Sequence, residues 1–160
     1  MEEQEDLVDF GPLPPHINAL LQQGVACHRS DPARARALFG SAIQLAPDAL
    51  PAYRALFKHL NRLREFDAAL EVAATGLLEA TRQAGVSPDW RLWRRAELGD
   101  LQEAPQRFLL QFLKAIAFIQ LRRGQPAITR EALAQLQALD PEDGCGASVL
   151  AALLDEMEDA

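Results

Sequence analysis

The sequence predicts an all-α fold. Three observations support this prediction: the chain holds 28 alanines and 26 leucines, residues that favour strands are scarce, and apolar residues recur at helical spacing over most of its length. With 160 residues, 49% of them hydrophobic and 24% charged, the chain has the size and composition of one globular domain. Because only two cysteines are present, a disulfide scaffold is excluded.

Residues 1–15 are expected to form an acidic, proline-rich tail. Four acids lie among the first six residues, and three prolines fall between positions 12 and 15, where they prevent a regular helix. Leu7, Val8 and Phe10 are the apolar residues of this tail that could dock on the domain.

Helical periodicity and turn signals place the elements that follow. Asp31 can cap a helix that has Pro32 in its first turn, whereas Pro47 and Gly85 each end one. The stretch 105–123 is apolar on most of its circumference, so we expect it at the centre of the core. The predicted helices cover residues 16–29, 32–46, 49–63, 67–83, 105–123, 126–139 and 147–157.

Residues 84–109 interrupt this pattern and are predicted to be an inserted segment with its own helix from about 88 to 98. Trp90 and Trp93, three residues apart, would then share one helical side among several arginines. One interpretation is that the two rings pin the insertion to the domain. The other is an exposed interface built from Trp90, Trp93 and Arg94.

An internal repeat appears when the chain is shifted by 34 residues. Ala35 then falls on Ala69 and Ala42 falls on Gly76, which are small residues of the kind found where two helices pack closely. Three such units can be drawn, at about 16–49, 50–83 and 110–143.

This pattern resembles the tetratricopeptide repeat, as found in small bacterial proteins of that family. The first unit shows Gly24, Ala35, Phe39, Ala42 and Pro47, with one residue fewer than usual between Gly24 and Ala35. The second unit has Thr81 in place of the closing proline, and the third has Thr129 in place of the first alanine. The resemblance implies a right-handed solenoid of about three helical hairpins, with residues 84–109 inserted and residues 147–157 as a capping helix, within a single domain at 16–158.

The resemblance also implies that the first helix of each unit lines a concave groove. Arg54, Lys58 and Arg62 recur every fourth residue and so form one stripe of a helix. The stripe is either an ordinary solvated face or a basic groove for an acidic segment. Lys58 stands where family members that clamp a C-terminal carboxylate usually have Asn. The residues predicted to bind a partner are Arg54, Lys58, Asn61, Arg62, Lys114, Phe118 and Arg122.

Charge is unevenly distributed along the chain, whose net charge is −7. Residues 29–130 contain all 16 bases, whereas residues 1–28 and 131–160 contain acids and no Lys or Arg. These acidic ends are either solubilising tails or segments that fold back on the basic surface and compete with an acidic ligand. They disfavour nucleic acid as a partner. With no apolar run long enough to span a bilayer and no signal peptide, we expect a cytoplasmic protein that does not bind membranes.

No residue pattern indicates catalysis, a metal or a cofactor. Cys27 and His28 are adjacent, Cys145 lies far along the chain, and no glycine-rich phosphate loop or serine nucleophile motif is present. We therefore expect a non-catalytic adaptor or scaffold that binds a peptide or helix of another protein.

Two other functions stay open. A dedicated chaperone, similar to those of type III secretion translocators, would need exposed apolar pockets, and Phe118 and Leu121 favour it mildly. Self-assembly through the convex or terminal faces is the other alternative, although we expect a monomer or a weak homodimer.

Overall fold

The computed structural model describes residues 8–159, and within this part of the chain it contains helices and no strand, so the predicted all-α class is confirmed. The predicted helix ends outside the insertion differ from the observed ones by at most two residues. The helices are α1 (Pro15–Cys27), α2 (Pro32–Leu45), α3 (Leu50–Arg62), α4 (Phe66–Ala84), the 3-10 helix η1 (Trp90–Leu92), α5 (Arg95–Leu98), α6 (Gln106–Arg122), α7 (Pro126–Leu139) and α8 (Ala147–Asp159).

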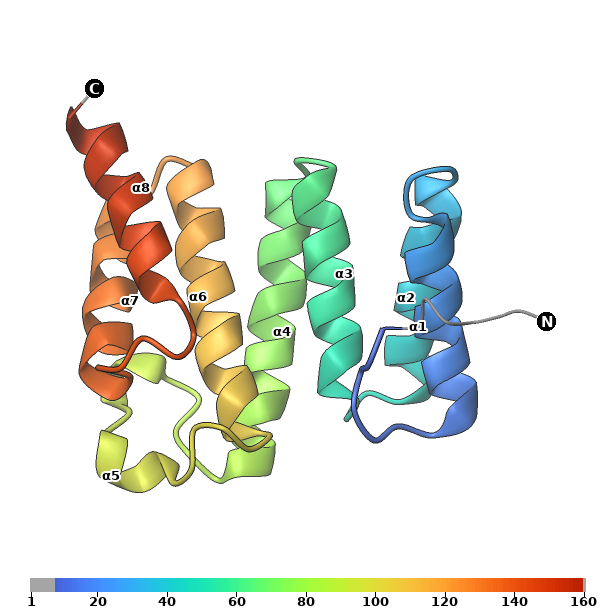
Figure 1. The fold of residues 1–160 in the computed structure, drawn as a ribbon, viewed down its shortest axis with the longest axis horizontal. Helices are drawn as coiled ribbons and strands as arrows, with labels where there is room; N and C mark the ends of the chain where they lie inside the picture. Colours follow the sequence, from blue (N-terminus) through green and yellow to red (C-terminus); the bar gives the residue numbers. More distant parts are fainter. Residues whose placement is uncertain (1–7, 160) are drawn as a thin grey trace.

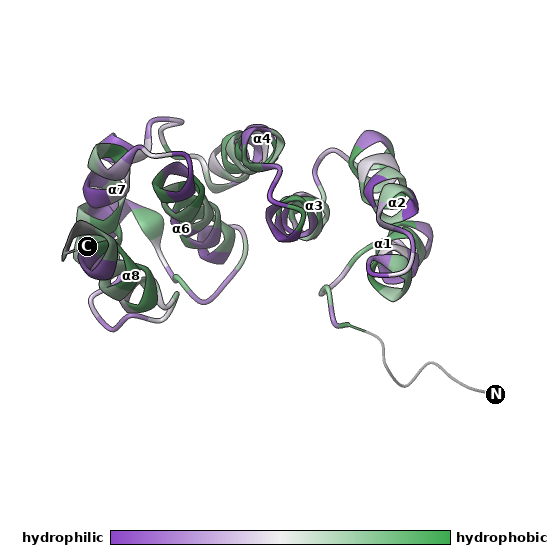
Figure 2. Cartoon of the chain, turned by 90° about the horizontal axis from the view of Figure 1, so that it is seen from above, coloured by the Kyte–Doolittle hydropathy of each residue, from purple (hydrophilic) through white to green (hydrophobic). Residues whose placement is uncertain are grey.

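The long helices pack mainly against their neighbours in the sequence. Within pairs, α1 packs on α2, α3 on α4 and α6 on α7; between pairs, α2 packs on α3 and α4 on α6 (Figure 1). Seen end-on, the first helix of each pair lies on the same side of its partner, and α8 lies on that side next to α6 and α7 (Figure 2). One face of the molecule is therefore formed by α1, α3, α6 and α8.

Two of the hairpin turns are built alike. In the turn from α3 to α4, the Arg64 N–H donates to the Asn61 carbonyl and Arg64 has a left-handed φ of 60°. In the turn from α6 to α7, the Gly124 N–H donates to the Leu121 carbonyl and Gly124 has a φ of 79°. Because these turns correspond, Arg54 and Lys114 occupy matching positions on α3 and α6.

Two glycines allow helices to approach closely. A Cβ at Gly24 would lie 2.4 Å from the Phe39 ring, and one at Gly76 would lie 2.8 Å from the Phe112 ring and 2.9 Å from the Tyr53 Cβ. Phe39 and Phe112 are almost fully buried, so neither ring has space to move away. Gly24 thus joins α1 to α2, and Gly76 joins α4 to both α3 and α6.

Helix α6 lies at the centre of the core, as its all-round apolar sequence predicts. Leu109, Phe112, Leu113, Ala117 and Ile119 are fully buried. Phe112 meets Phe57 of α3 at a ring-centroid distance of 5.8 Å. Since α6 contacts α3, α4, α7 and α8, it fixes their relative positions.

The insertion differs from its prediction, because it does not form one helix from 88 to 98. After η1, Trp93 and Arg94 are extended, with ψ angles of 141° and 142°, and α5 starts only at Arg95. The Gln135 side-chain amide of α7 donates to the Trp90 and Trp93 carbonyls, at 2.7 and 3.0 Å. These carbonyls therefore anchor the segment to α7.

The described part of the N-terminal segment is docked on the domain. The Val8 N–H donates to Gln22 Oε1 and the Val8 carbonyl accepts from Gln22 Nε2, at 3.1 and 2.6 Å. Phe10 and Leu13 are half-buried against the core. Of the three apolar residues that could dock, Phe10 packs against the core and Val8 is held through its backbone, whereas Leu7 and the acids of residues 2–6 lie outside the described residues. Among residues 8–159, no helix combines the length and apolar character that a membrane crossing requires.

Candidate partner-binding groove

A groove with a volume of about 500 Å³ lies between α3, α6 and α8. Five of the seven residues predicted to bind a partner line it: Arg54, Lys58, Asn61, Lys114 and Phe118. The sequence-derived stripe on α3 and its counterpart on α6 thus meet in one cavity, which we call the α3–α6–α8 groove. Its remaining lining residues are Phe57, Gln111, Ala115, Gly144, Cys145, Gly146, Val149, Leu150 and Leu153.

The cations on the α3 side have no partner within the described structure. Over residues 8–159, Arg54, Lys58 and Arg62 form no ion pair and no side-chain hydrogen bond, in contrast to Arg36, Arg82, Arg91 and Arg123, which pair with carboxylates. Arg54 is half-buried, and Lys58 is exposed one turn further along α3. The groove therefore presents positive charge that the described fold leaves uncompensated.

The pKa values of Lys58 and Arg54 reflect this crowding of like charges. Partial burial, followed by repulsion from Arg54, Arg62 and Lys114, lowers the pKa of Lys58 below its usual 10.5. Burial and the neighbouring Arg107 lower the pKa of Arg54. An anion placed between these side chains would relieve the repulsion and favour their charged forms.

Asn61, in the lining of the groove, has an amide oxygen without a hydrogen-bond donor among the described residues. Its Oδ1 is buried and accepts no hydrogen bond from any described residue. Buried polar atoms in folded proteins are normally hydrogen-bonded. This side chain therefore retains hydrogen-bonding capacity that the fold does not use.

The opposite wall of the groove is apolar and comes from α8, which sequence reasoning treated only as a cap. Leu150 is buried, Leu153 is half-buried, and Val149 is 74% exposed. The available signal was the width of the apolar face: Val149, Leu150, Leu153 and Leu154 cover more of the helix than one contact surface needs. Phe118 of α6 extends this apolar surface, whereas Leu121 is buried and takes no part in it.

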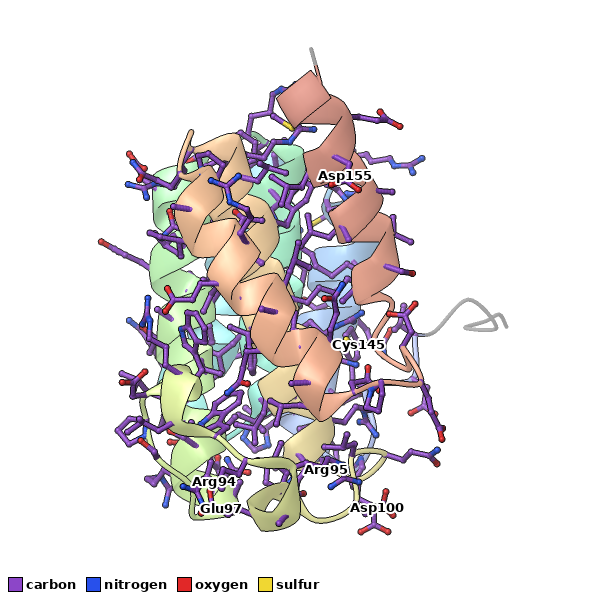
Figure 3. The ribbon with its side chains drawn as sticks, turned by 90° about the vertical axis from the view of Figure 1, so that its left-hand side faces the viewer. Arg94, Arg95, Glu97, Asp100, Cys145 and Asp155 are labelled. Atoms are coloured by element: carbon purple, nitrogen blue, oxygen red, sulfur yellow. The ribbon has the colours of Figure 1, made fainter. Side chains whose placement is uncertain are left out.

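Lys114 is in the groove, but its ammonium group is already engaged. Its Nζ donates to the Cys145 carbonyl at 2.7 Å and so fastens the loop before α8 to α6. Figure 3 shows Cys145 at the start of α8. Burial, followed by the nearby Asp140, raises the pKa of the Cys145 thiol to about 11, so the thiol is protonated at neutral pH and is a poor nucleophile.

The other two predicted residues lie outside the lining of the groove. Arg62 is exposed one turn beyond Lys58 on α3. Arg122 is exposed at the end of α6, where its guanidinium carbon lies 5.3 Å from the centroid of the Phe118 ring. Both therefore extend the positive charge beyond the cavity itself.

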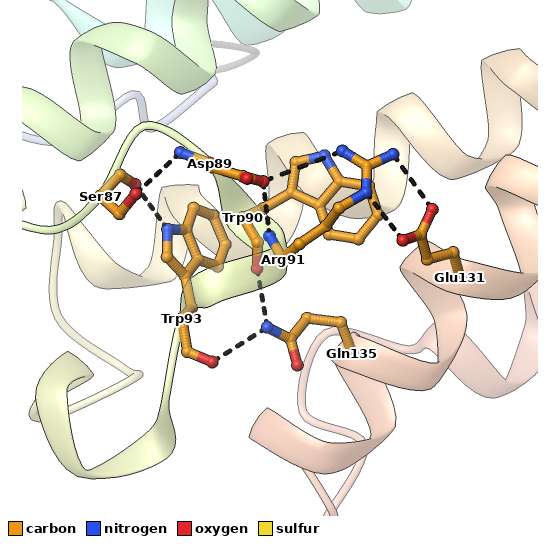
Figure 4. A network of polar contacts seen from close by, with 7 residues as sticks. All are labelled: Ser87, Asp89, Trp90, Arg91, Trp93, Glu131 and Gln135. Carbon is orange, nitrogen blue, oxygen red and sulfur yellow. Dashed lines mark hydrogen bonds and ion pairs between the residues drawn. The ribbon is translucent and has the colours of Figure 1, made fainter.

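The tryptophans of the insertion do not form an exposed patch. Trp90 and Trp93 are 8% and 4% exposed, and Trp93 Nε1 donates to the Ser87 carbonyl at 2.7 Å (Figure 4). Arg91 stacks on Trp90 at 4.2 Å from its ring centroid and forms two hydrogen bonds to Glu131 of α7. The rings thus attach the insertion to the domain, which corrects the proposed exposed interface.

Arg94, the third residue of that candidate interface, is exposed. It lies with Arg95, Glu97 and Asp100 at the end of the molecule opposite the C-terminal end of α8, where Asp155 is found (Figure 3). Without the two indole rings, Arg94 is an isolated surface cation in a mixed-charge region.

Within residues 8–159, no three His, Cys, Asp or Glu side chains come together in a way that could hold a metal ion. Comparison with protein-family models, curated proteins and solved structures finds no match for the chain.

Proposed function

We propose that the chain is a non-catalytic, cytoplasmic protein-interaction module with a tetratricopeptide-like solenoid of three helical hairpins, α1–α2, α3–α4 and α6–α7. Their successive packing, the matching turns at Arg64 and Gly124, and the close contacts at Gly24 and Gly76 support this proposal. In this arrangement α5 and η1 are an insertion and α8 is the cap.

The ligand that best suits the α3–α6–α8 groove is an acidic, amphipathic segment of another protein. Its carboxylates would face Arg54 and Lys58, and its apolar side chains would face Val149 and Leu153. The observation that carries this proposal is the pairing of uncompensated cations on one wall with an exposed apolar wall opposite.

The test uses a fluorescent synthetic peptide, Leu-Glu-Glu-Leu-Leu-Glu-Glu-Leu, and anisotropy. Wild type should bind it with an affinity that falls as salt is added, because the contacts are charged. The triple variant Arg54→Glu, Lys58→Glu, Arg62→Glu should bind at least about tenfold more weakly, since a hydrogen bond to a charged group contributes about 1.5–3 kcal/mol.

The matched control reverses three exposed arginines outside the groove: Arg29→Glu, Arg34→Glu and Arg94→Glu. It changes the net charge equally and should leave peptide binding unchanged. Equal losses in both triple variants would show that only overall charge matters and would contradict a specific site. A pull-down from host lysate with the same three proteins would then select the natural partner.

The apolar wall also supports a second candidate function, a chaperone for a largely apolar segment. Val149 is the observation in its favour, because 74% of this side chain is exposed beside Leu153 and Phe118. Replacing each Glu of the peptide by Gln separates the two functions. A chaperone groove would keep the neutral peptide, and an acidic-ligand groove would lose it.

A further inference from the structure

The N-terminal segment is anchored next to the α3–α6–α8 groove. Val8, Asp9, Phe10, Gly11 and Pro12 border a second cavity, of about 460 Å³, which they share with Arg54, Arg107 and Gln111. Arg54 and Gln111 line both cavities. Val8, the first described residue of the segment, therefore lies next to the edge of the groove.

The anchor itself is specific. Gln22 of α1 uses both atoms of its amide to hold the Val8 backbone, and Phe10 packs against the core. Residues 1–7 therefore start from a fixed point beside α3. Seven residues can extend about 23 Å at about 3.3 Å per residue. Arg54 and Arg62 are only about 12 Å apart along the helix, at 1.5 Å per residue.

The composition of residues 1–7 matches what the groove requires. The segment carries Glu2, Glu3, Glu5 and Asp6, with the apolar residues Met1 and Leu7 at either side, and it contains no base. On the groove side, all the charged groups that shift the pKa of Lys58 are cations, namely Arg54, Arg62 and Lys114. Residues 2–6 thus add four acids directly before Asp9, which lines the second cavity together with Arg54.

From this charge complementarity and anchoring, we propose that residues 1–7 are an internal occupant of the α3–α6–α8 groove that competes with the acidic ligand. This inference rests on the proposed function. A short tether raises the local concentration of the segment to the millimolar range, so a partner must displace it before binding. Only a ligand that binds the groove tightly enough to displace this segment would therefore be bound.

Zero-length carbodiimide cross-linking tests the contact without any partner. Lys58 and Lys114 are the only lysines in the chain, and both line the groove. The reagent joins a carboxylate to an amine that touches it. In dilute wild-type protein we expect a link between residues 2–6 and Lys58, and its loss in about 0.5 M salt. Mass spectrometry of the joined peptides 1–29 and 55–62 identifies it, with fragment ions that separate residues 2–6 from Asp9 as the linked acid.

The test variant is Glu2→Gln, Glu3→Gln, Glu5→Gln, Asp6→Asn in the full chain. It should bind the acidic peptide about tenfold more tightly than wild type, because several weak ion pairs are removed from the competitor. The matched control neutralises four acids elsewhere, as Glu71→Gln, Glu97→Gln, Asp155→Asn, Glu156→Gln, and should bind the peptide as wild type does.

Three outcomes would overturn the inference. One is the absence of any link from residues 2–6 to either lysine. Another is a link that forms between isotopically light and heavy copies in a mixture, because the occupant would then be a second molecule. The third is equal tightening in both neutralised variants. If instead the variant with Arg54, Lys58 and Arg62 changed to Glu keeps full peptide affinity while the internal link still forms in wild type, the proposed function fails and the internal contact stands.

Discussion

The groove and the insertion contain the same kinds of residue and use them differently. In the insertion, Arg91 lies on a buried indole ring and its guanidinium is held by Glu131. In the groove, Arg54 and Lys58 lie near aromatic and apolar side chains and have no carboxylate partner among the described residues. Arginine beside an aromatic ring is therefore a candidate for binding only when the cation is unpaired and the ring is accessible.

The largest expected effect comes from removing an indole ring of the insertion. Trp93→Ala should lower the free energy of unfolding by about 3–5 kcal/mol, because a buried ring is lost and the Ser87 carbonyl loses its donor. Urea denaturation measures this loss. Leu92→Ala is the matched control, since Leu92 is 63% exposed, and should change stability by no more than about 0.5 kcal/mol. Equal losses at both positions would contradict the structural role of Trp93.

The affinity for the acidic peptide should decrease about tenfold as pH is raised. Because the pKa of Lys58 lies below its usual 10.5, the side chain loses its charge at a lower pH than a free lysine, so affinity for the acidic peptide should fall as pH rises through that lowered pKa. Stability should move the other way over this window: the unfolded chain keeps the proton to a higher pH than the folded one, so folding becomes more favourable as pH rises.

Lys58→Arg separates the contribution of Lys58 from other titrations, because arginine stays charged throughout. In this variant, anisotropy titrations should show binding that no longer declines over the same pH range. A decline of unchanged size would mean that another group carries the pH dependence.

The smallest effect is expected at the ion pair of the insertion. Glu131→Gln removes the charge of its contact with Arg91 and leaves the stacking of Arg91 on Trp90 in place; at a half-exposed position such pairs contribute about 0.2–1 kcal/mol. Peptide affinity should not change at all. Thermal unfolding and anisotropy measure the two quantities, and weaker peptide binding would show that the insertion belongs to the binding surface.

Most of the fold was predictable because its signals are local. Asp31, Pro32, Pro47 and Gly85 mark helix ends by their own chemistry, and apolar spacing identified α6 as the central helix. The break after Trp90–Leu92 was not predictable in the same way, because Gln135, more than forty residues away, binds the carbonyls that a continuous helix would have used.

Part of the groove lining was also predictable from local signals. Spacing on one helix placed Arg54 and Lys58 on a common stripe, and equivalent positions on α6 added Phe118. The sequence could not reveal that the Lys114 ammonium would donate a hydrogen bond to the Cys145 carbonyl, or that Val149 would line the groove. Both depend on how the loop before α8 crosses α6, which is a tertiary contact.

The most direct measurement of the central claim is an NMR titration of the isotopically labelled full chain with the Leu-Glu-Glu-Leu-Leu-Glu-Glu-Leu peptide. Unpaired cations in the α3–α6–α8 groove predict that amide shifts concentrate on α3, α6 and the start of α8, together with the side-chain amide of Asn61. Shifts confined to η1 and α5, or spread evenly over all exposed arginines, would contradict the claim that this groove is the binding site.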